Sequence, residues 1–201
     1  MRVVRTLILG SAKESIQTSA LAAAAEVSAA RASQVLKRLQ GAALAEKQPN
    51  GTWEVDRAAL FDVFIETYPG PGEDLREFYA LDLQRAAREL TGGAQRDGVV
   101  SADLAADILS PYRRPTHLIA YLRTPYLSPS QGLIAAESPQ DANVWVIHPT
   151  DSSVFPRHAM DPSNGIPLAD ATQVAWDLKR LGGSDRLLHL DRLKTWILSS
   201  R

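Results

Sequence analysis

The sequence contains no cysteine. Without thiols the chain can form neither disulfides nor cysteine-ligated metal centres, and cysteine-based catalysis is excluded. It also has no uninterrupted run of about 18 or more apolar residues, the length that a membrane-spanning helix needs, and its first residues lack the cleavage pattern of a signal peptide. We therefore expect a cytoplasmic protein, with no membrane contact, whose fold depends on a core of aliphatic and aromatic side chains.

The sequence also lacks a strong net charge, which is −1 over 201 residues. This value gives no global attraction to nucleic acid, but the charge is unevenly distributed. Residues 1–57 hold eight basic and five acidic side chains, a net charge of +3, and the remainder carries −4. Any contact with phosphate groups is therefore expected in the N-terminal part of the chain.

Two helices separated by about three residues are predicted in the first quarter of the chain. Residues 19–27 are almost all strong helix formers, with Thr18 or Ser19 placed as the N-cap. Ser28 is an N-cap residue for the next helix, in which Leu36 and Leu39 lie on an apolar stripe that ends at Gly41. A shorter helix over residues 3–8 precedes them. The short junction between the helix over residues 19–27 and the helix that follows Ser28 is typical of a helix-turn-helix, whose second helix enters the DNA major groove.

The second of these helices carries the donors that DNA recognition uses. Arg31 and Gln34 can bond base edges, whereas Lys37 and Arg38, one turn later, can reach phosphate oxygens. Further on, Pro49, Asn50 and Gly51 form a turn signal between two extended runs, which predicts a hairpin wing with Trp53 in the core. The predicted DNA-binding residues are Ser28, Arg31, Ser33, Gln34, Lys37, Arg38, Lys47, Gln48 and Asn50.

The remaining sequence predicts a second domain. A helix capped by Asp56 covers residues 57–68, and the segment 69–74, PGPGED, ends it. We expect a winged helix-turn-helix domain over residues 1–68, a linker over 69–74, and a mixed α/β regulatory domain with a small sheet over 75–201. In that domain the patterns predict helices over 75–90, 101–109, 171–181 and 185–199, and strands over 117–123, 132–136 and 143–148. The expected fold class is α+β.

Motifs of known catalytic chemistry are missing. No phosphate-binding loop, nucleophile elbow or dinucleotide fingerprint occurs, so we expect neither an enzyme nor a cofactor. The four histidines lack the spacing of a helical metal pair, and the nearest approach to a ligand cluster is His158 with Asp161. Asp103 and Asp107 lie four apart on one predicted helix, where a like-charged pair indicates a solvated face. No metal site is expected.

Several segments resemble the AbiE-type (AbiEi-like) antitoxin family of transcriptional regulators from type IV toxin-antitoxin systems. They are VSAARASQVLKRLQGAALAEK, TWEVDRAALFDVF, SADLAADILSPYRRPTHLIAYL and ADATQVAWDLKRLGGSDR, in the same order as in that family. The resemblance implies an autorepressor whose winged domain binds inverted or direct repeats in double-stranded operator DNA, as a homodimer or as cooperative monomers. It also implies a second domain that counteracts a nucleotidyltransferase-like toxin without a stable complex.

The resemblance places the recognition helix at residues 29–39 and the wing at 47–50. It also marks Arg113 and Arg114 as a functional surface of the second domain, although two solvated arginines at a helix end would show the same pattern. The alternative function is a protein-interaction module whose second domain engages a partner protein without operator binding. These two functions differ in their prediction for DNA, since only the first requires binding that weakens steeply with salt.

Overall fold

A computed structural model of the chain describes residues 1–10, 15–72, 74–92, 98–126, 132–156 and 165–199. The fold is α+β, and the chain divides into two compact units. Unit one comprises Met1–Tyr68 together with Lys194–Arg201, and unit two comprises Pro69–Leu193. Among the described residues, no helix is long and apolar enough to cross a bilayer.

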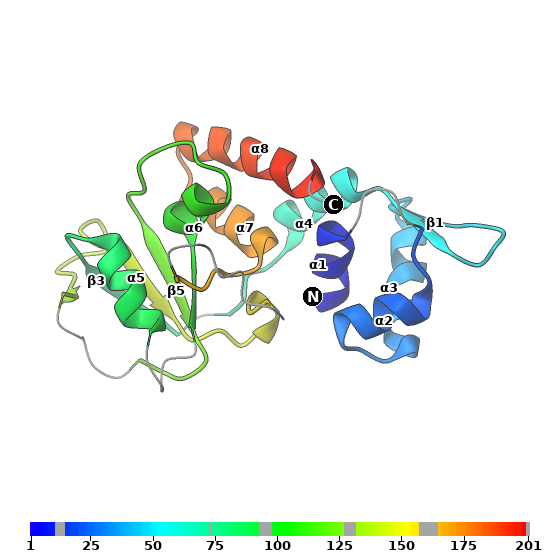
Figure 1. The fold of residues 1–201 in the computed structure, drawn as a ribbon, viewed down its shortest axis with the longest axis horizontal. Coiled ribbons are helices and arrows are strands. Elements are labelled where there is room, and N and C mark those ends of the chain that lie inside the picture. The colour runs from blue at the N-terminus through cyan, green and yellow to red at the C-terminus, as the bar shows by residue number, and fades with distance from the viewer. Residues whose placement is uncertain (11–14, 73, 93–97, 127–131, 157–164, 200–201) are drawn as a thin grey trace. The chain divides into compact units, whose positions relative to one another are not determined.

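Unit one begins with three helices, α1 (Arg2–Leu9), α2 (Thr18–Ala25) and α3 (Ala29–Gly41), which Figure 1 shows in blue. The predicted cap at the start of α3 is confirmed, because the Ser28 hydroxyl accepts the Arg31 backbone N–H at 3.1 Å. For α2, by contrast, the N-cap residue is Gln17, which makes no side-chain cap bond. The three helices bury an aliphatic core that includes Ile8, Leu21 and Leu36.

The predicted hairpin is present as β1 (Ala45–Lys47) and β2 (Trp53–Val55), paired antiparallel. A single residue before α2 extends this small sheet, since Ile16 and Trp53 exchange two backbone hydrogen bonds of 2.9 Å. Trp53 is buried as predicted, and its indole N–H donates to Thr18 Oγ1 at 3.2 Å. The hairpin is therefore attached to the helices through its second strand.

The helix α4 (Arg57–Thr67) is capped as predicted, with Asp56 Oδ1 accepting the Ala59 N–H at 2.9 Å. Its first residue, Arg57, donates to the Ile8 carbonyl at 2.7 and 2.9 Å and to the carbonyls of Ile197 and Leu198 at 3.0 and 3.3 Å. These carbonyls lie at the C-terminal ends of α1 and of the last helix, where a cation is favoured. Residues 194–201, which the sequence pattern assigns to the second domain, therefore belong to unit one.

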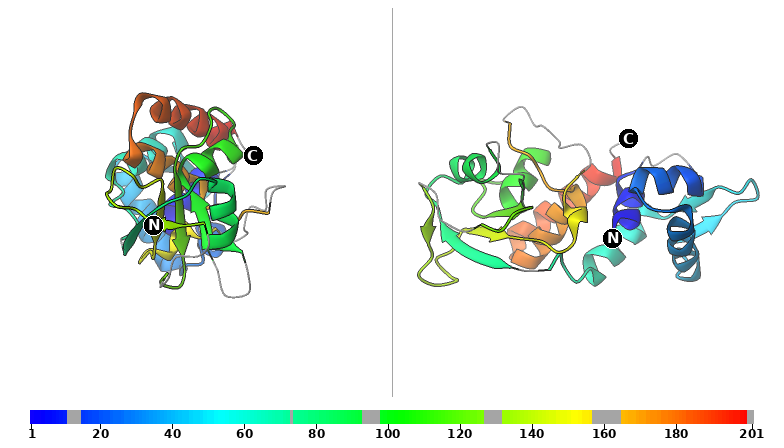
Figure 2. Two further views of the ribbon diagram at one scale, coloured as in Figure 1. Left: turned by 90° about the vertical axis from the view of Figure 1, so that its left-hand side faces the viewer. Right: turned by 90° about the horizontal axis from the view of Figure 1, so that it is seen from below.

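Unit two contains a five-stranded sheet in the order β4-β5-β7-β3-β6. Figure 2 draws its strands in colours from blue-green to yellow. The central pair β5–β7 is parallel and the other pairs are antiparallel. The strands are β3 (Leu75–Tyr79), β4 (Gly98–Ser101), β5 (Leu118–Leu122), β6 (Ile134–Ala135) and β7 (Val144–Ile147). The described helices are α5 (Leu83–Thr91), α6 (Ala102–Leu109), the short 3₁₀ helix η1 (Ser152–Val154), α7 (Ala171–Leu181) and α8 (Ser184–Ser199), which ends in unit one.

One secondary-structure prediction is wrong. The segment 75–90, expected as a single helix, is a strand followed by the helix α5, whose N-cap Asp82 accepts the Arg85 N–H. The reason is pairing with a distant segment, because residues 75–78 each lie opposite a residue of β7. Tertiary pairing of this kind overrides local helix preference. The strand β4 was not predicted either, and its outer edge is covered where Val100 bonds the backbone of residues 167 and 169.

Candidate nucleic-acid interface

The exposed face of α3 carries a row of basic and amide side chains. Arg31, Gln34, Lys37 and Arg38 follow one another at spacings of three, three and one, and all four are exposed. The opposite side of the helix faces the core through Ala32, Leu36 and Leu39. The helical period thus separates the residues that hold the helix in place from those that it presents to solvent. We refer to the four exposed residues as the α3 stripe.

The charges of this stripe are not neutralised within the described part of the chain. The sequence of α3 contains no acidic residue, and the side chains of Arg31, Lys37 and Arg38 make no ion pair with any described residue. The acid nearest before α3, Glu26, is bonded by Arg2 Nη1 at 2.7 Å. The α3 stripe is therefore a local positive surface on a protein of nearly zero net charge.

The two predicted serine contacts have different environments. The Ser28 hydroxyl is occupied as the cap of α3, so its acceptor function is structural. Ser33 is half-buried, on the flank of the helix between the core and the α3 stripe. Ser28 is exposed but its hydroxyl is engaged in the cap, and Ser33 is less exposed than Arg31 or Gln34. Base-edge contacts from α3 would therefore come first from the arginine and the glutamine.

The tip of the hairpin is shaped by Asn50. Its Oδ1 accepts the Thr52 N–H at 3.0 Å and the Thr52 hydroxyl at 2.6 Å, while Gly51 takes a φ of 85°. Asn50 thus acts mainly as a turn former. Lys47 is exposed, and its ammonium lies 6.0 Å from the centre of the Trp53 ring on the same strand face. Gln48 is half-buried and closes the turn through its backbone.

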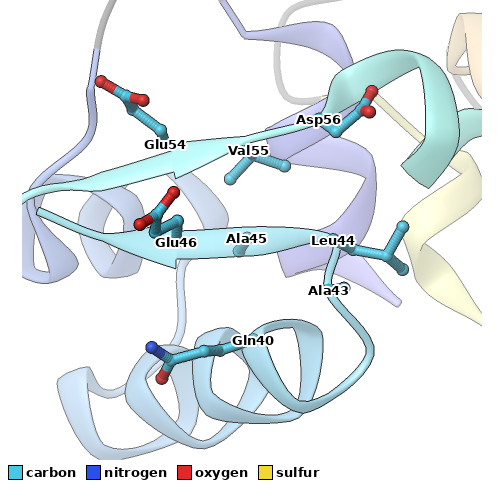
Figure 3. Close-up of a pocket in the computed structure, with 8 residues that line it drawn as sticks. All are labelled: Gln40, Ala43, Leu44, Ala45, Glu46, Glu54, Val55 and Asp56. Atoms are coloured by element: carbon cyan, nitrogen blue, oxygen red, sulfur yellow. The ribbon is translucent and has the colours of Figure 1, made fainter.

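A shallow pocket of about 510 Å³ lies between the end of α3 and the hairpin, lined by Gln40, residues 43–46 and residues 54–56 (Figure 3). Two of its acids, Glu46 and Glu54, are directly opposite each other in the strand register, and Asp56 follows. Like charges in such a cross-strand pair are unfavourable. The pocket is therefore lined by acidic side chains, whereas Lys47 alternates with Glu46 along β1 and lies opposite Trp53.

In unit two, the two predicted arginines lie between α6 and β5. Arg114 is exposed and makes no ion pair with a described residue, whereas Arg113 is half-buried and lies near Thr116 and Asp185. The expectation that Asp103 lies on a solvated face is wrong. Asp103 is fully buried in α6, which packs against α7, β4 and β5, and the side chains of Thr116 and Arg186 donate to its carboxylate.

The described histidines do not form a metal site. His117, His148 and His189 have separate partners, and His158 and Asp161 lie outside the described residues. No group of three or more potential metal ligands occurs among the residues that the structure describes. The sequence patterns also gave no signal for a buried polar network that joins Asp177 to Ser101, Tyr121 and Gln173. Each of these side chains is inaccessible to solvent, so the network is part of the core of unit two.

The comparisons with protein-family models, with curated proteins and with solved structures find no match.

Proposed function

We propose that unit one is a winged helix-turn-helix that binds double-stranded DNA, with α3 as the recognition helix. Its element order supports this proposal: the helix α1, a single extended residue, the helices α2 and α3, and a hairpin whose second strand pairs with that extended residue. The junction between α2 and α3 is three residues long and turns through Glu26 in the left-handed region. The second helix of such a pair can enter the major groove with its first turns.

The α3 stripe is the observation that carries the proposal. Arg31 and Gln34 lie in the first half of α3, where a recognition helix meets base edges. The guanidinium of Arg31 has paired donors and Gln34 has a side-chain amide, and both groups are used in base recognition. Lys37 and Arg38 are one turn further along, suited to phosphate contacts that fix the register. The proposed wing contact is Lys47. Ser28 caps α3 and Asn50 forms the hairpin turn, so both residues contribute by fixing the local structure.

We further propose that the protein represses its own promoter as a type IV antitoxin. The support is the resemblance of four segments to the AbiE-type antitoxin regulators, which extends into unit two. On this proposal the operator contains repeated half-sites, bound by a homodimer or by cooperative monomers, and the toxin is a nucleotidyltransferase-like protein that forms no stable complex with the antitoxin. A rival function is a protein-interaction module whose second domain engages a basic partner protein without operator binding, and the observation that favours it is the net charge of −4 carried by the residues after 57.

A mobility shift with the DNA upstream of the gene separates these functions. The test variant is the triple substitution Arg31→Ala, Gln34→Ala, Lys37→Ala in α3. The control is Arg76→Ala, Gln84→Ala, Arg88→Ala in unit two, which removes the same number of charges and amides from exposed positions. We expect the wild type and the control to bind the upstream fragment in preference to a scrambled one, and the test variant to lose binding. Equal binding by both variants would show that α3 is not the DNA-contacting helix.

A further inference from the structure

Gln34 lies at the centre of the solvent-exposed side of α3. The buried residues of this helix are Ala32, Leu36 and Leu39. At about 100° of rotation per residue, position 34 is about 160° around the axis from positions 32 and 36 and about 140° from position 39. The Gln34 side chain is exposed, and it makes no hydrogen bond with any described residue. Its amide is therefore a free donor and acceptor directed away from the core of unit one.

Cations lie on both sides of Gln34. Lys37 is about 60° around the axis in one direction, and Arg31 is about 60° in the other, with Arg38 between Arg31 and Gln34. All three are exposed, and none has an ion pair with a described residue. The major groove of B-DNA is about 12 Å wide and lies between two rows of phosphates. With Gln34 facing the floor of such a groove, α3 therefore turns a cation toward each strand, and Arg31 is also long enough to reach a base edge.

The first turn of α3 leaves space in front of Gln34. Ala29 and Ala30 are exposed and have no side-chain atom beyond Cβ. Ala30 lies one turn before Gln34 on the same side of the helix, about 40° around the axis. The Ser28 cap fixes this turn, since its hydroxyl accepts the Arg31 N–H at 3.1 Å. The N-terminal end of α3 thus presents a methyl group at position 30 and can approach a groove floor closely.

We propose that Gln34 reads an adenine of the operator half-site and that Ala30 packs against the methyl group of a neighbouring thymine. This inference rests on the proposed DNA binding by α3 and names the base pairs that the helix selects. The Gln34 amide matches adenine, because Nε2 donates to N7 while Oε1 accepts from the N6 amino group. The thymine methyl is the apolar group on the major-groove edges, and it suits the alanine side chain.

The spacing of the two residues limits where the thymine lies. Positions 30 and 34 are about 6 Å apart along the helix axis, and base pairs are stacked about 3.4 Å apart, so the thymine is within about two base pairs of the adenine. A larger side chain at position 30 would fill the space between α3 and the groove floor. It would therefore hold the Gln34 amide away from the bases.

The test is a base-analogue scan of the DNA upstream of the gene, after footprinting has located the bound half-site. Each adenine is replaced singly by 7-deazaadenine, which lacks the N7 acceptor, and each thymine by uracil, which lacks the methyl group. Affinities are measured for the wild type, Gln34→Ala and Ala30→Gly. The matched control is Gln40→Ala, because Gln40 is exposed on the same helix but about 120° around the axis from Gln34.

We expect one 7-deazaadenine position to weaken binding by the wild type and by the control by about fivefold or more, and to have no effect on Gln34→Ala. A uracil within about two base pairs of that position should weaken wild-type binding by about threefold and have no effect on Ala30→Gly. Ala30→Gln should lose most of the affinity. The analogues change only the DNA, and the far-UV circular dichroism of each variant checks its fold.

Two results would overturn this inference alone. If the wild type binds the fragment but no analogue effect disappears in Gln34→Ala, α3 binds DNA without reading an adenine through Gln34. If the uracil effects are the same in the wild type and in Ala30→Gly, Ala30 does not contact a thymine. No binding of the upstream fragment by the wild type would instead overturn the proposed function, and this inference with it.

Discussion

The hydroxyl of Ser101 donates to Asp177 Oδ2 at 2.5 Å, although Ser101 stands at the N-cap of α6, where its side chain is expected to accept a backbone N–H. Tyr121 adds bonds of 2.8 and 3.1 Å to the same carboxylate. Burial raises the pKa of Asp177 to about 6, and the three donors and Arg180 only partly oppose this effect. A carboxyl group therefore titrates inside the core of unit two.

The first prediction concerns the pH dependence of stability. The pKa of Asp177 is higher in the folded state than in the unfolded state. The contribution of this carboxyl group to the free energy of unfolding is therefore fully present below about pH 4 and is lost as the pH rises through about 6. The shift corresponds to roughly 3 kcal/mol of unfolding free energy. We expect urea unfolding to show that the stability of the wild type relative to Asp177→Asn falls by about this amount between pH 4 and 7. The stability of the wild type relative to the exposed control Asp74→Asn should not change in this way with pH. The prediction is refuted if the stability of Asp177→Asn depends on pH in the same way as that of the wild type.

The second prediction concerns Arg57, which donates to carbonyls at the ends of α1 and α8. Replacement by alanine leaves partly buried carbonyls without a donor, and we expect unit one to lose about 2 kcal/mol or more. Unfolding can be followed by tryptophan fluorescence, to which the buried Trp53 of unit one contributes. The control Lys37→Ala, at an exposed position without an ion pair to a described residue, should change stability by less than about 0.5 kcal/mol. Equal effects of the two substitutions would contradict the assigned role.

The third prediction concerns the like-charged pair of Glu46 and Glu54 in the hairpin. Glu54→Lys creates an opposite-charge cross-strand pair, and we expect it to raise the stability of unit one by about 0.5 kcal/mol at low salt. The double variant Glu46→Lys, Glu54→Lys restores like charges and should lose this gain. If the double variant is as stable as the single one, the effect does not come from the pair.

Local signals in the sequence were sufficient for most elements of unit one. The Ser28 and Asp56 caps, the turn at Asn50 and the core position of Trp53 each depend on residues a few positions apart, and the structure has all of them. The strand β3 was missed because its preference comes from pairing with β7, about 70 residues away, which no local pattern reports.

The candidate nucleic-acid interface and the other groups of polar side chains also differ in whether they depend on residues close together in the sequence or on distant segments. The α3 stripe could be found from sequence because a helix places residues three and four apart on one face. The arrangement of Asp103, Thr116, His117 and Arg186 could not, because it joins α6, the loop before β5 and α8. Sequence spacing indicated a solvated face for Asp103, and only the fold shows that the carboxylate is buried and bonded by Arg186 of α8.

The most direct test of the proposed function is the salt dependence of binding to the upstream DNA. Each phosphate contact contributes a slope of about −0.9 to a plot of log K against log salt concentration. We predict sequence-preferring binding by the wild type and a slope smaller in magnitude by about 2 in the Lys37→Ala, Arg38→Ala variant. An unchanged slope in that variant, or no binding by the wild type at low salt, would contradict the assignment of α3 to the DNA interface.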